Sequence, residues 1–292
     1  MVKVVVATSF LLIGFLAKAQ DSSASEQAKQ FQGKAEYFSK RMYSKKTTSD
    51  NSKKEMDPEL EKEFKDALKK ATEKRFVLTF NKSEASYEEE QELAKPMVSG
   101  ETSISISFSG AGKKYINIKD KKTIVEEDMF GKEFVVTDSL ENSNWKLIDE
   151  IKKIGDYTCF KAELIIPVTE REKQAYKTYL EKTANSNKTK LLGAMEEPKD
   201  KIVTAWYTPE IPVSLGPSNY YGLPGFILEV NEEKIVLLCS KVTLNIKSAL
   251  KIKPPSNGKS VTKKEFNAIE KKKREQLMDE DGVIRFSSTI QQ

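Results

Sequence analysis

The chain has 292 residues, of which 38% are hydrophobic and 32% charged, so it can form a buried core within a very polar surface. It contains no histidine, which excludes Ser-His-Asp and Cys-His catalysis and every zinc site that uses imidazole. The formal charge of +5 arises from lysines and acids that are interspersed through most of the sequence, a pattern that does not indicate a nucleic-acid-binding protein.

Residues 1–19 have the pattern of a secretory signal peptide. A basic start at Lys3 precedes the apolar run Val4 to Leu16, and Ala17-Lys18-Ala19 is a small-x-small cleavage site. The apolar run is shorter than the roughly 20 residues that span a bilayer. We therefore expect cleavage after Ala19 and no transmembrane segment in the mature chain, whose charge falls from +5 to +3 with the loss of Lys3 and Lys18. We expect residues 20–292 to form a single exported domain, periplasmic or secreted beyond the outer membrane.

The first half of the mature chain is predicted to be rich in strands. Gly33 to Tyr43 alternates between apolar and polar residues and predicts a first strand. Asp57-Pro58 is a typical helix start and predicts a helix that ends near Lys74. From Arg75 the hydrophobic period changes to two, which predicts short strands at 75–81, 83–88, 102–109, 114–118, 123–127, 133–138 and 145–151. The short turns between these strands require antiparallel neighbours.

The second half adds further strands, an insertion and a helix. Tyr157 to Val168 and Ile202 to Tyr207 predict strands on either side of a polar, partly helical surface insertion at about 169–201. Lys234 to Ile246 predicts a strand pair or one long bent strand. Thr262 and Glu265 form a capping box that begins a C-terminal helix. The predicted fold class is therefore strand-dominated α+β, a curved antiparallel sheet with one helix after the first strand and a C-terminal helix.

The stretch Tyr220 to Val230 has the most tightly specified backbone in the chain. Pro224 and Gly225 predict a type II turn with Gly225 at positive φ, followed by a strand that starts at Phe226. One interpretation is a well-defined connection between strands, with its aromatic residues packed in the core. The alternative is a candidate binding rim, made of Trp206, Tyr207, Pro212, Gly216, Pro217, Tyr220, Tyr221, Gly222, Leu223, Pro224 and Gly225.

The remaining residues with chemical potential are two cysteines and two acidic runs. Cys159 and Cys239 lie in apolar, strand-like segments, which leaves two alternatives, a disulfide or two buried free thiols. The acidic runs at 126–128 and 196–197 could supply a carboxylate pair, but adjacent residues of a strand point to opposite faces. We identify no catalytic, cofactor-binding or metal-binding residues and expect the protein not to be an enzyme.

The stretch around the Leu-Pro-Gly turn also resembles the signature of the GLPGLI family, exported proteins of Bacteroidota of largely unknown function. Further segments resemble the family in the same order, namely 76–81 with 84–87, 134–140, 145–162 and 205–212 leading to Gly216-Pro217. The resemblance implies export and an association with outer-membrane uptake systems of the TonB-dependent type. It also implies a sheet similar to the half-barrel of lipoprotein carriers, which is an analogy of fold alone.

These observations lead to three hypotheses for function. The first is a non-catalytic binding protein of the cell envelope that holds an apolar or small ligand in the concave sheet. The second is a protein–protein interaction partner of an outer-membrane TonB-dependent uptake system, which needs no cavity. The third is a histidine-independent hydrolase that uses the acidic runs, which the missing residue types and the solvated character of such runs disfavour.

Overall fold

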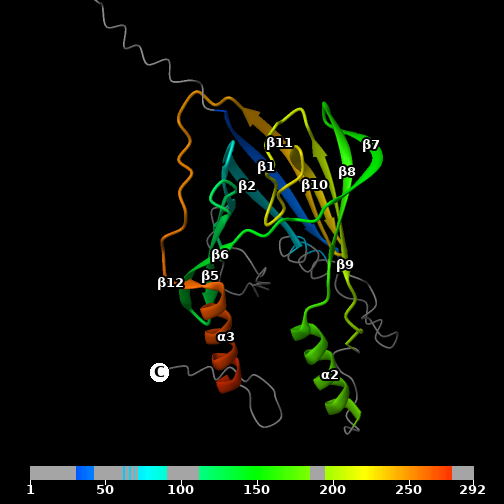
Figure 1. Cartoon of the computed structure of the whole chain (residues 1–292), viewed down its shortest axis with the longest axis vertical. Helices are drawn as coiled ribbons and strands as arrows, with labels where there is room; N and C mark the ends of the chain where they lie inside the picture. Colours follow the sequence, from blue (N-terminus) through cyan, green and yellow to red (C-terminus); the bar gives the residue numbers. More distant parts are fainter. Residues whose placement is uncertain are drawn as a thin grey trace, which may run out of the picture. The chain divides into compact units, whose positions relative to one another are not determined.

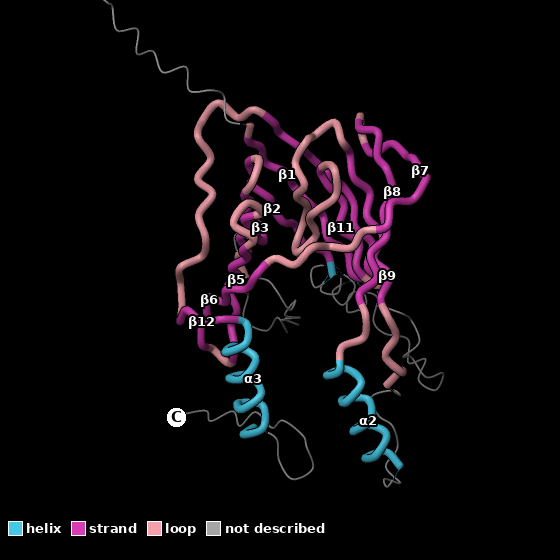
Figure 2. The backbone as a smooth tube through the Cα atoms, in the orientation of Figure 1, coloured by secondary structure: helices cyan, strands magenta, loops and turns pink. Residues whose placement is uncertain are grey.

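The structure is a computed structural model that describes residues 31–42, 72–90, 112–184 and 195–277, together with Lys62, Asp66 and Lys69. Strands make up most of the described elements (Figures 1 and 2), and all of them belong to the compact unit Phe31–Gln292. The predicted signal peptide and the predicted strand at 102–109 lie outside the described residues. Lys62, Asp66, Lys69 and Thr72, which fall within the predicted helix after the first strand, are helical.

Within the described residues, a single 12-stranded sheet has the order β12-β6-β5-β4-β3-β2-β1-β11-β10-β9-β8-β7. The strands are β1 (Gln32–Arg41), β2 (Glu73–Asn81), β3 (Glu84–Glu89), β4 (Lys114–Asn117), β5 (Lys122–Met129), β6 (Lys132–Ser139), β7 (Lys146–Ile154), β8 (Tyr157–Ile166), β9 (Lys201–Thr208), β10 (Phe226–Glu232), β11 (Ile235–Leu244) and β12 (Lys259–Thr262). Neighbouring strands are antiparallel, as predicted, except that β12 pairs with β6 in parallel. The segment predicted as a strand pair or one long strand is the single strand β11.

The chain builds this sheet as two meanders that start and end at its centre. Strands β1 to β6 run outward on one side, and β7 to β11 return from the opposite edge until β11 pairs with β1. The link from β6 to β7 joins strands that would lie about 48 Å apart in a flat sheet, at about 4.8 Å per strand. The short link after Ser139 reaches at most about 25 Å before Lys146. The sheet must therefore curve, and it remains open because β12 and β7 do not pair.

Two groups of buried side chains form most of the core. The first cluster joins β1 to β4 with β10 and β11 and includes Tyr37, Leu78, Phe80, Ile116, Phe226 and Leu228. The second cluster lies on β8 to β11 and includes Ala162, Val203, Ala205, Ile227, Val230 and Leu237. Tyr37 is 1% exposed, and its hydroxyl donates to the Ile227 carbonyl at 2.6 Å, which links the two clusters and satisfies a buried polar group.

Both described α-helices begin with a capping box. In α3 (Lys263–Leu277) the Thr262 hydroxyl accepts from the Glu265 amide at 3.2 Å, and the Glu265 carboxylate accepts from the Thr262 amide at 2.7 Å, which confirms the prediction. In α2 (Glu170–Ala184) Thr169 and Glu172 make the same exchange, which the sequence analysis missed. Helix α2 accounts for the helical part of the predicted insertion. No helix among the described residues is long and apolar enough to cross a membrane.

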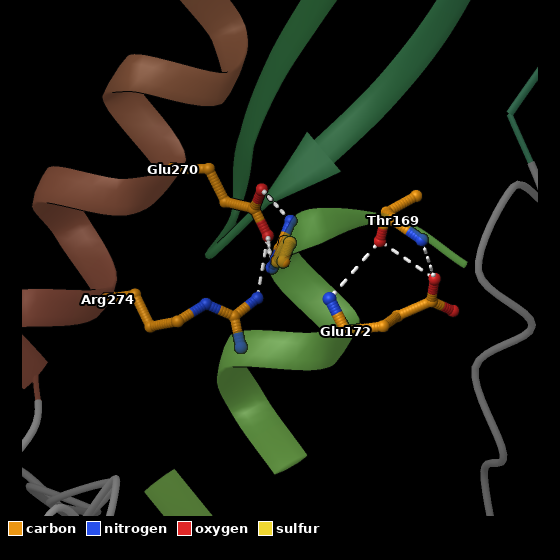
Figure 3. A network of polar contacts seen from close by, with 5 residues as sticks. Thr169, Glu172, Glu270 and Arg274 are labelled. Carbon is orange, nitrogen blue, oxygen red and sulfur yellow. Dashed lines mark hydrogen bonds and ion pairs between the residues drawn. The ribbon is translucent and has the colours of Figure 1, made fainter. Parts of the chain in front are cut away.

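An ion cluster connects α2 with α3 (Figure 3). Arg171 of α2 donates to both carboxylate oxygens of Glu270 of α3 at 3.2 and 3.3 Å, and Arg274 donates to one of them at 2.6 Å. Burial opposes ionisation of Glu270, but the two guanidinium groups outweigh it and lower the pKa of this carboxyl below its ordinary value. Because Arg171 is 67% exposed, this contact contributes little to stability.

Candidate functional site

The Leu-Pro-Gly stretch belongs to a longer connection between β9 and β10, residues 209–225, which we call the strap. The strap folds back on itself, since Leu215 and Tyr221 form an isolated antiparallel bridge and the Gly222 amide donates to the Ser214 carbonyl at 3.0 Å. It is also bonded to the start of β10, where the amides of Phe226 and Ile227 donate to the carbonyls of Ile211 and Leu215, both at 3.1 Å. The strap is therefore a fixed part of the fold.

The apolar side chains of the strap are part of the protein core. Ile211 and Leu215 are 0% exposed and Val213 is 2% exposed, and all three pack in the first cluster against β1 to β4. Leu223 is 1% exposed and packs in the second cluster. The apolar surface that the sheet presents to these clusters is thus covered by a segment of the same chain.

The turn at Pro224 differs from the predicted type II turn. The Gly225 amide donates to the Leu223 carbonyl at 2.8 Å, a bond that spans three residues and defines a γ-turn centred on Pro224. Gly225 is not among the residues with positive φ, whereas Gly222 has a φ of 91°. A Cβ on Gly225 would lie 2.3 Å from the Thr208 carbonyl oxygen, so this position requires glycine because two backbones approach closely.

The link between β6 and β7, residues 140–145, which we call the crossover, holds the strap from the other side. The Trp145 indole N–H donates to the Tyr221 carbonyl at 2.9 Å, and the Tyr221 hydroxyl donates to the Glu141 carbonyl at 2.5 Å. Leu140 packs on the first cluster and Trp145 on the second. The same segment that joins the two meanders therefore also fastens the strap.

Two polar side chains, the buried Lys114 and the half-buried Tyr220, complete the surroundings of the strap. Lys114 of β4 is only 9% exposed and donates to the Ser218 hydroxyl at 3.1 Å, and burial lowers the pKa of this ammonium group. Ser218 itself has a φ of 58°, which is uncommon for a residue with a side chain. The Tyr220 hydroxyl donates to Glu232 at 2.7 Å, and burial, with a further effect of that carboxylate, raises the pKa of Tyr220.

The structure divides the eleven residues of the predicted binding rim. Tyr207, Gly216, Pro217, Leu223 and Gly225 are buried, and Trp206, Tyr220 and Tyr221 are half-buried, while only Pro212, Gly222 and Pro224 are exposed. Trp206 is covered by Lys152, whose ammonium lies 4.3 Å from the ring centroid and 2.7 Å from a carboxylate oxygen of Glu229. Sequence reasoning missed Lys114, Ser218 and Trp145, because no local pattern shows that these residues meet the strap.

Cys159 and Cys239 are free and buried, which is the second of the two alternatives. Their strands, β8 and β11, are separated by β9 and β10, so the strands would lie about 14 Å apart in a flat sheet, at about 4.8 Å per strand. A disulfide needs Cα atoms within about 7 Å. Burial raises the pKa of Cys159 to about 11 and that of Cys239 to about 12, so neither thiol is an activated nucleophile. Among the described residues, no cluster of three or more acids or cysteines could hold a metal ion.

Comparison with known proteins matches the part of the chain that contains the strap. Residues 145–229, from Trp145 of the crossover to Glu229 of β10, match the family described as "Protein of unknown function (Porph_ging)". No curated protein matches the chain. Two similar solved structures are those of PNGF-II in the C2 and P21 space groups, each with 14% sequence identity and a TM-score of 0.45. The matches cover 83% and 84% of this chain but only 33% and 34% of those chains, so this chain spans about a third of their length.

Proposed function

We propose that this chain is an exported accessory protein of the cell envelope that acts by binding another protein, and that it is not an enzyme. The packing of the strap carries this proposal. Ile211, Val213 and Leu215 cover the apolar surface of the sheet that would otherwise receive a small ligand. This packing favours the protein-binding hypothesis over the ligand-binding one.

The outer strands of the second meander offer the surface that such a partner would cover. Leu147 and Ile151 of β7 are 57% and 60% exposed, and Ile165 of β8 and Ile202 of β9 are 62% and 57% exposed. Ile165 and Ile202 are direct cross-strand neighbours. We call these four residues the β7 margin. Strand β7 also ends the sheet, so its outer backbone groups have no strand partner among the described residues.

The proposal also names a family for the chain and a partner that it binds. We propose that the chain is a GLPGLI family protein with a half-barrel of the lipoprotein-carrier type. The partner we propose is a component of an outer-membrane TonB-dependent uptake system. The match of residues 145–229 to a family of unknown function supports the first part, because this segment contains the Leu-Pro-Gly turn.

Site-specific photo-crosslinking in the source cells tests the proposal. A photoreactive amino acid at Leu147 or Ile202, both exposed in the β7 margin, should give a single defined adduct with an outer-membrane protein. The matched control is the same amino acid at Lys121, an exposed position in the turn between β4 and β5. Adducts from Lys121 but not from the margin would contradict the proposed surface.

Native mass spectrometry of the purified mature chain separates the two binding hypotheses. The protein-binding proposal expects the mass of the polypeptide alone. A bound lipid or other small apolar mass, lost in a variant that enlarges a side chain of the strap, would instead support the ligand-binding hypothesis.

A further inference from the structure

The segment after β11, Asn245–Leu277, concentrates the positive charge of the protein. We call it the basic arm, and Figure 1 shows it as a continuous orange to red segment through β12 and α3. It has three acids and ten basic residues, Lys247, Lys251, Lys253, Lys259, Lys263, Lys264, Lys271, Lys272, Lys273 and Arg274. Its net charge of +7 exceeds the +5 of the whole chain, so the remaining residues sum to −2. The arm is the exception to the interspersed charges elsewhere.

The cations of the basic arm are available to an external anion. All ten are exposed. Of the ten cations of the arm, only two form ion pairs within 4.0 Å with described residues, namely Lys271 with Glu275 and Arg274 with Glu270. The other eight cations are exposed lysines, one of which, Lys263, has its ammonium 5.6 Å from the ring centroid of Phe266. Long-range electrostatic attraction to an external anion would act on all of them together.

The backbone of the basic arm is fastened to the sheet. The Gln32 side chain donates to the carbonyls of Ile246 and Ser248 at 2.7 and 2.8 Å and accepts from the Leu250 amide at 3.1 Å. Ile252, between the exposed Lys251 and Lys253, packs on the cluster of Tyr115, Ile124 and Val135. The lysines are therefore held on an ordered scaffold, which lowers the entropic cost of binding.

Three large apolar side chains on β12 and α3 face inward. Val261 and Phe266 are each 8% exposed, and together with Ile269 they pack on Met129, Phe134 and Val136. The side chains of α3 that the structure describes therefore form no large exposed apolar face that could insert into a bilayer. Any contact made by the arm must be peripheral and electrostatic.

The residue types of the arm indicate which anion it fits. Nine of the ten cations are lysines, which act as point charges and lack the planar fork that selects a single carboxylate or phosphate. The only aromatic residue of the arm, Phe266, is buried, so no ring is free to stack on nucleic-acid bases. We propose that the basic arm binds an anionic lipid surface. This inference goes beyond the proposed function, since it requires no protein partner.

Vesicle co-sedimentation tests this inference. The protein used is the full mature chain, which includes the acids at 279–281 that follow the arm. The protein should sediment with phosphatidylcholine vesicles that contain phosphatidylglycerol and not with phosphatidylcholine alone. Binding should be lost near 1 M salt, where the Debye length falls to about 3 Å from about 10 Å at 0.1 M. Replacing Lys251, Lys253, Lys272 and Lys273 by Gln should lower the partition coefficient roughly a hundredfold or more.

The matched control replaces four other exposed lysines, Lys119, Lys122, Lys146 and Lys153, by Gln. Both variants lose the same net charge, but the control should bind vesicles within about threefold of the unmodified protein. Equal losses in both variants, no binding to anionic vesicles, or binding to dextran sulfate without binding to vesicles would each overturn the inference. Because no protein partner is present, these outcomes are independent of the crosslinking result at the β7 margin.

Discussion

The strap is an irregular connection between β9 and β10, whereas the basic arm includes β12 and α3, and the two segments use their side chains in opposite ways. The strap places Ile211, Val213 and Leu215 in the core and exposes Pro212 and Pro224. The arm places Ile252 and Phe266 against the sheet and exposes ten cations. The strap therefore completes the interior, while the arm forms a charged surface.

The difference teaches that sequence signature and functional surface need not coincide. The Leu-Pro-Gly turn is the most recognisable stretch of the chain, yet most of the residues around it are buried or half-buried. Apart from the capping box at Thr262, the arm has no recognisable motif, but its ten cations are exposed. Substitutions in the strap should thus affect mainly stability, and substitutions in the arm mainly binding.

The largest expected effect is on the packing of the strap. Leu215→Ala removes a fully buried side chain, so the free energy of unfolding should fall by about 2–5 kcal/mol. Urea unfolding, monitored by circular dichroism, measures this free energy of unfolding. Lys251→Ala in the exposed arm is the control and should change stability by less than about 0.5 kcal/mol. Similar values for the two variants would remove the contrast between the regions.

The second-largest loss of stability is expected at Gly225, where two backbone segments approach closely. Gly225→Ala should cost about 1–3 kcal/mol, because its Cβ would lie 2.3 Å from the Thr208 carbonyl oxygen. Gly222→Ala meets no atom closer than 3.7 Å and should show only the strain of a positive φ, roughly 1 kcal/mol. Thermal unfolding of both variants compares them. The reverse order would show that the contact at Gly225 relaxes easily and that the positive φ of Gly222 is the stricter requirement.

Loss of the hydrogen bond between the crossover and the strap should have a smaller effect on stability. Trp145→Phe keeps an aromatic ring but loses the indole donor to the Tyr221 carbonyl, so stability should fall by about 1 kcal/mol. Tyr221→Phe removes the second bond between the same two segments. In urea unfolding, the double variant should lose less stability than the sum of the two single losses. The reason is that both hydrogen bonds join the same two segments, so losing either bond already weakens their contact. Strictly additive losses would show that the crossover does not fasten the strap.

The smallest expected effect lies in the arm, at the start of α3. Hydrogen bonds from the Thr262 amide and hydroxyl lower the pKa of Glu265 below its ordinary value of 4.5. The contribution of this cap to stability is therefore present above pH 4.5 and is lost as the pH falls through the lowered pKa. Glu265→Gln should reduce the helical circular-dichroism signal near neutral pH, and the difference from the unmodified protein should shrink below pH 4.5. A difference that is independent of pH would contradict this role.

Much of the sheet could be predicted from the sequence because its strands alternate locally. The predicted strands at 75–81, 114–118 and 202–207 correspond closely to β2, β4 and β9. The capping box at Thr262 was also readable, since it depends on two residues one helical turn apart. Strand β12 was missed because its four residues become a strand only by pairing with β6.

The candidate site was predicted less well because its contacts are distant in sequence. Lys114 reaches Ser218 from β4, and Trp145 reaches Tyr221 from the crossover. Ile211, Val213 and Leu215 alternate with Pro212 and Ser214, a pattern that fits an exposed linker as well as a buried one. Only the curvature of the sheet brings the first meander against these side chains.

By itself, the sequence determined the absence of imidazole chemistry, the period-two strands with their short antiparallel turns, and the cap of the last helix. These properties depend on residue types and on neighbours within a few positions. The tertiary structure decided that the strap fills the sheet and that the basic arm is fixed to its outside. Burial depends on which strands, far apart in the sequence, lie close together in space, and no local sequence pattern shows this.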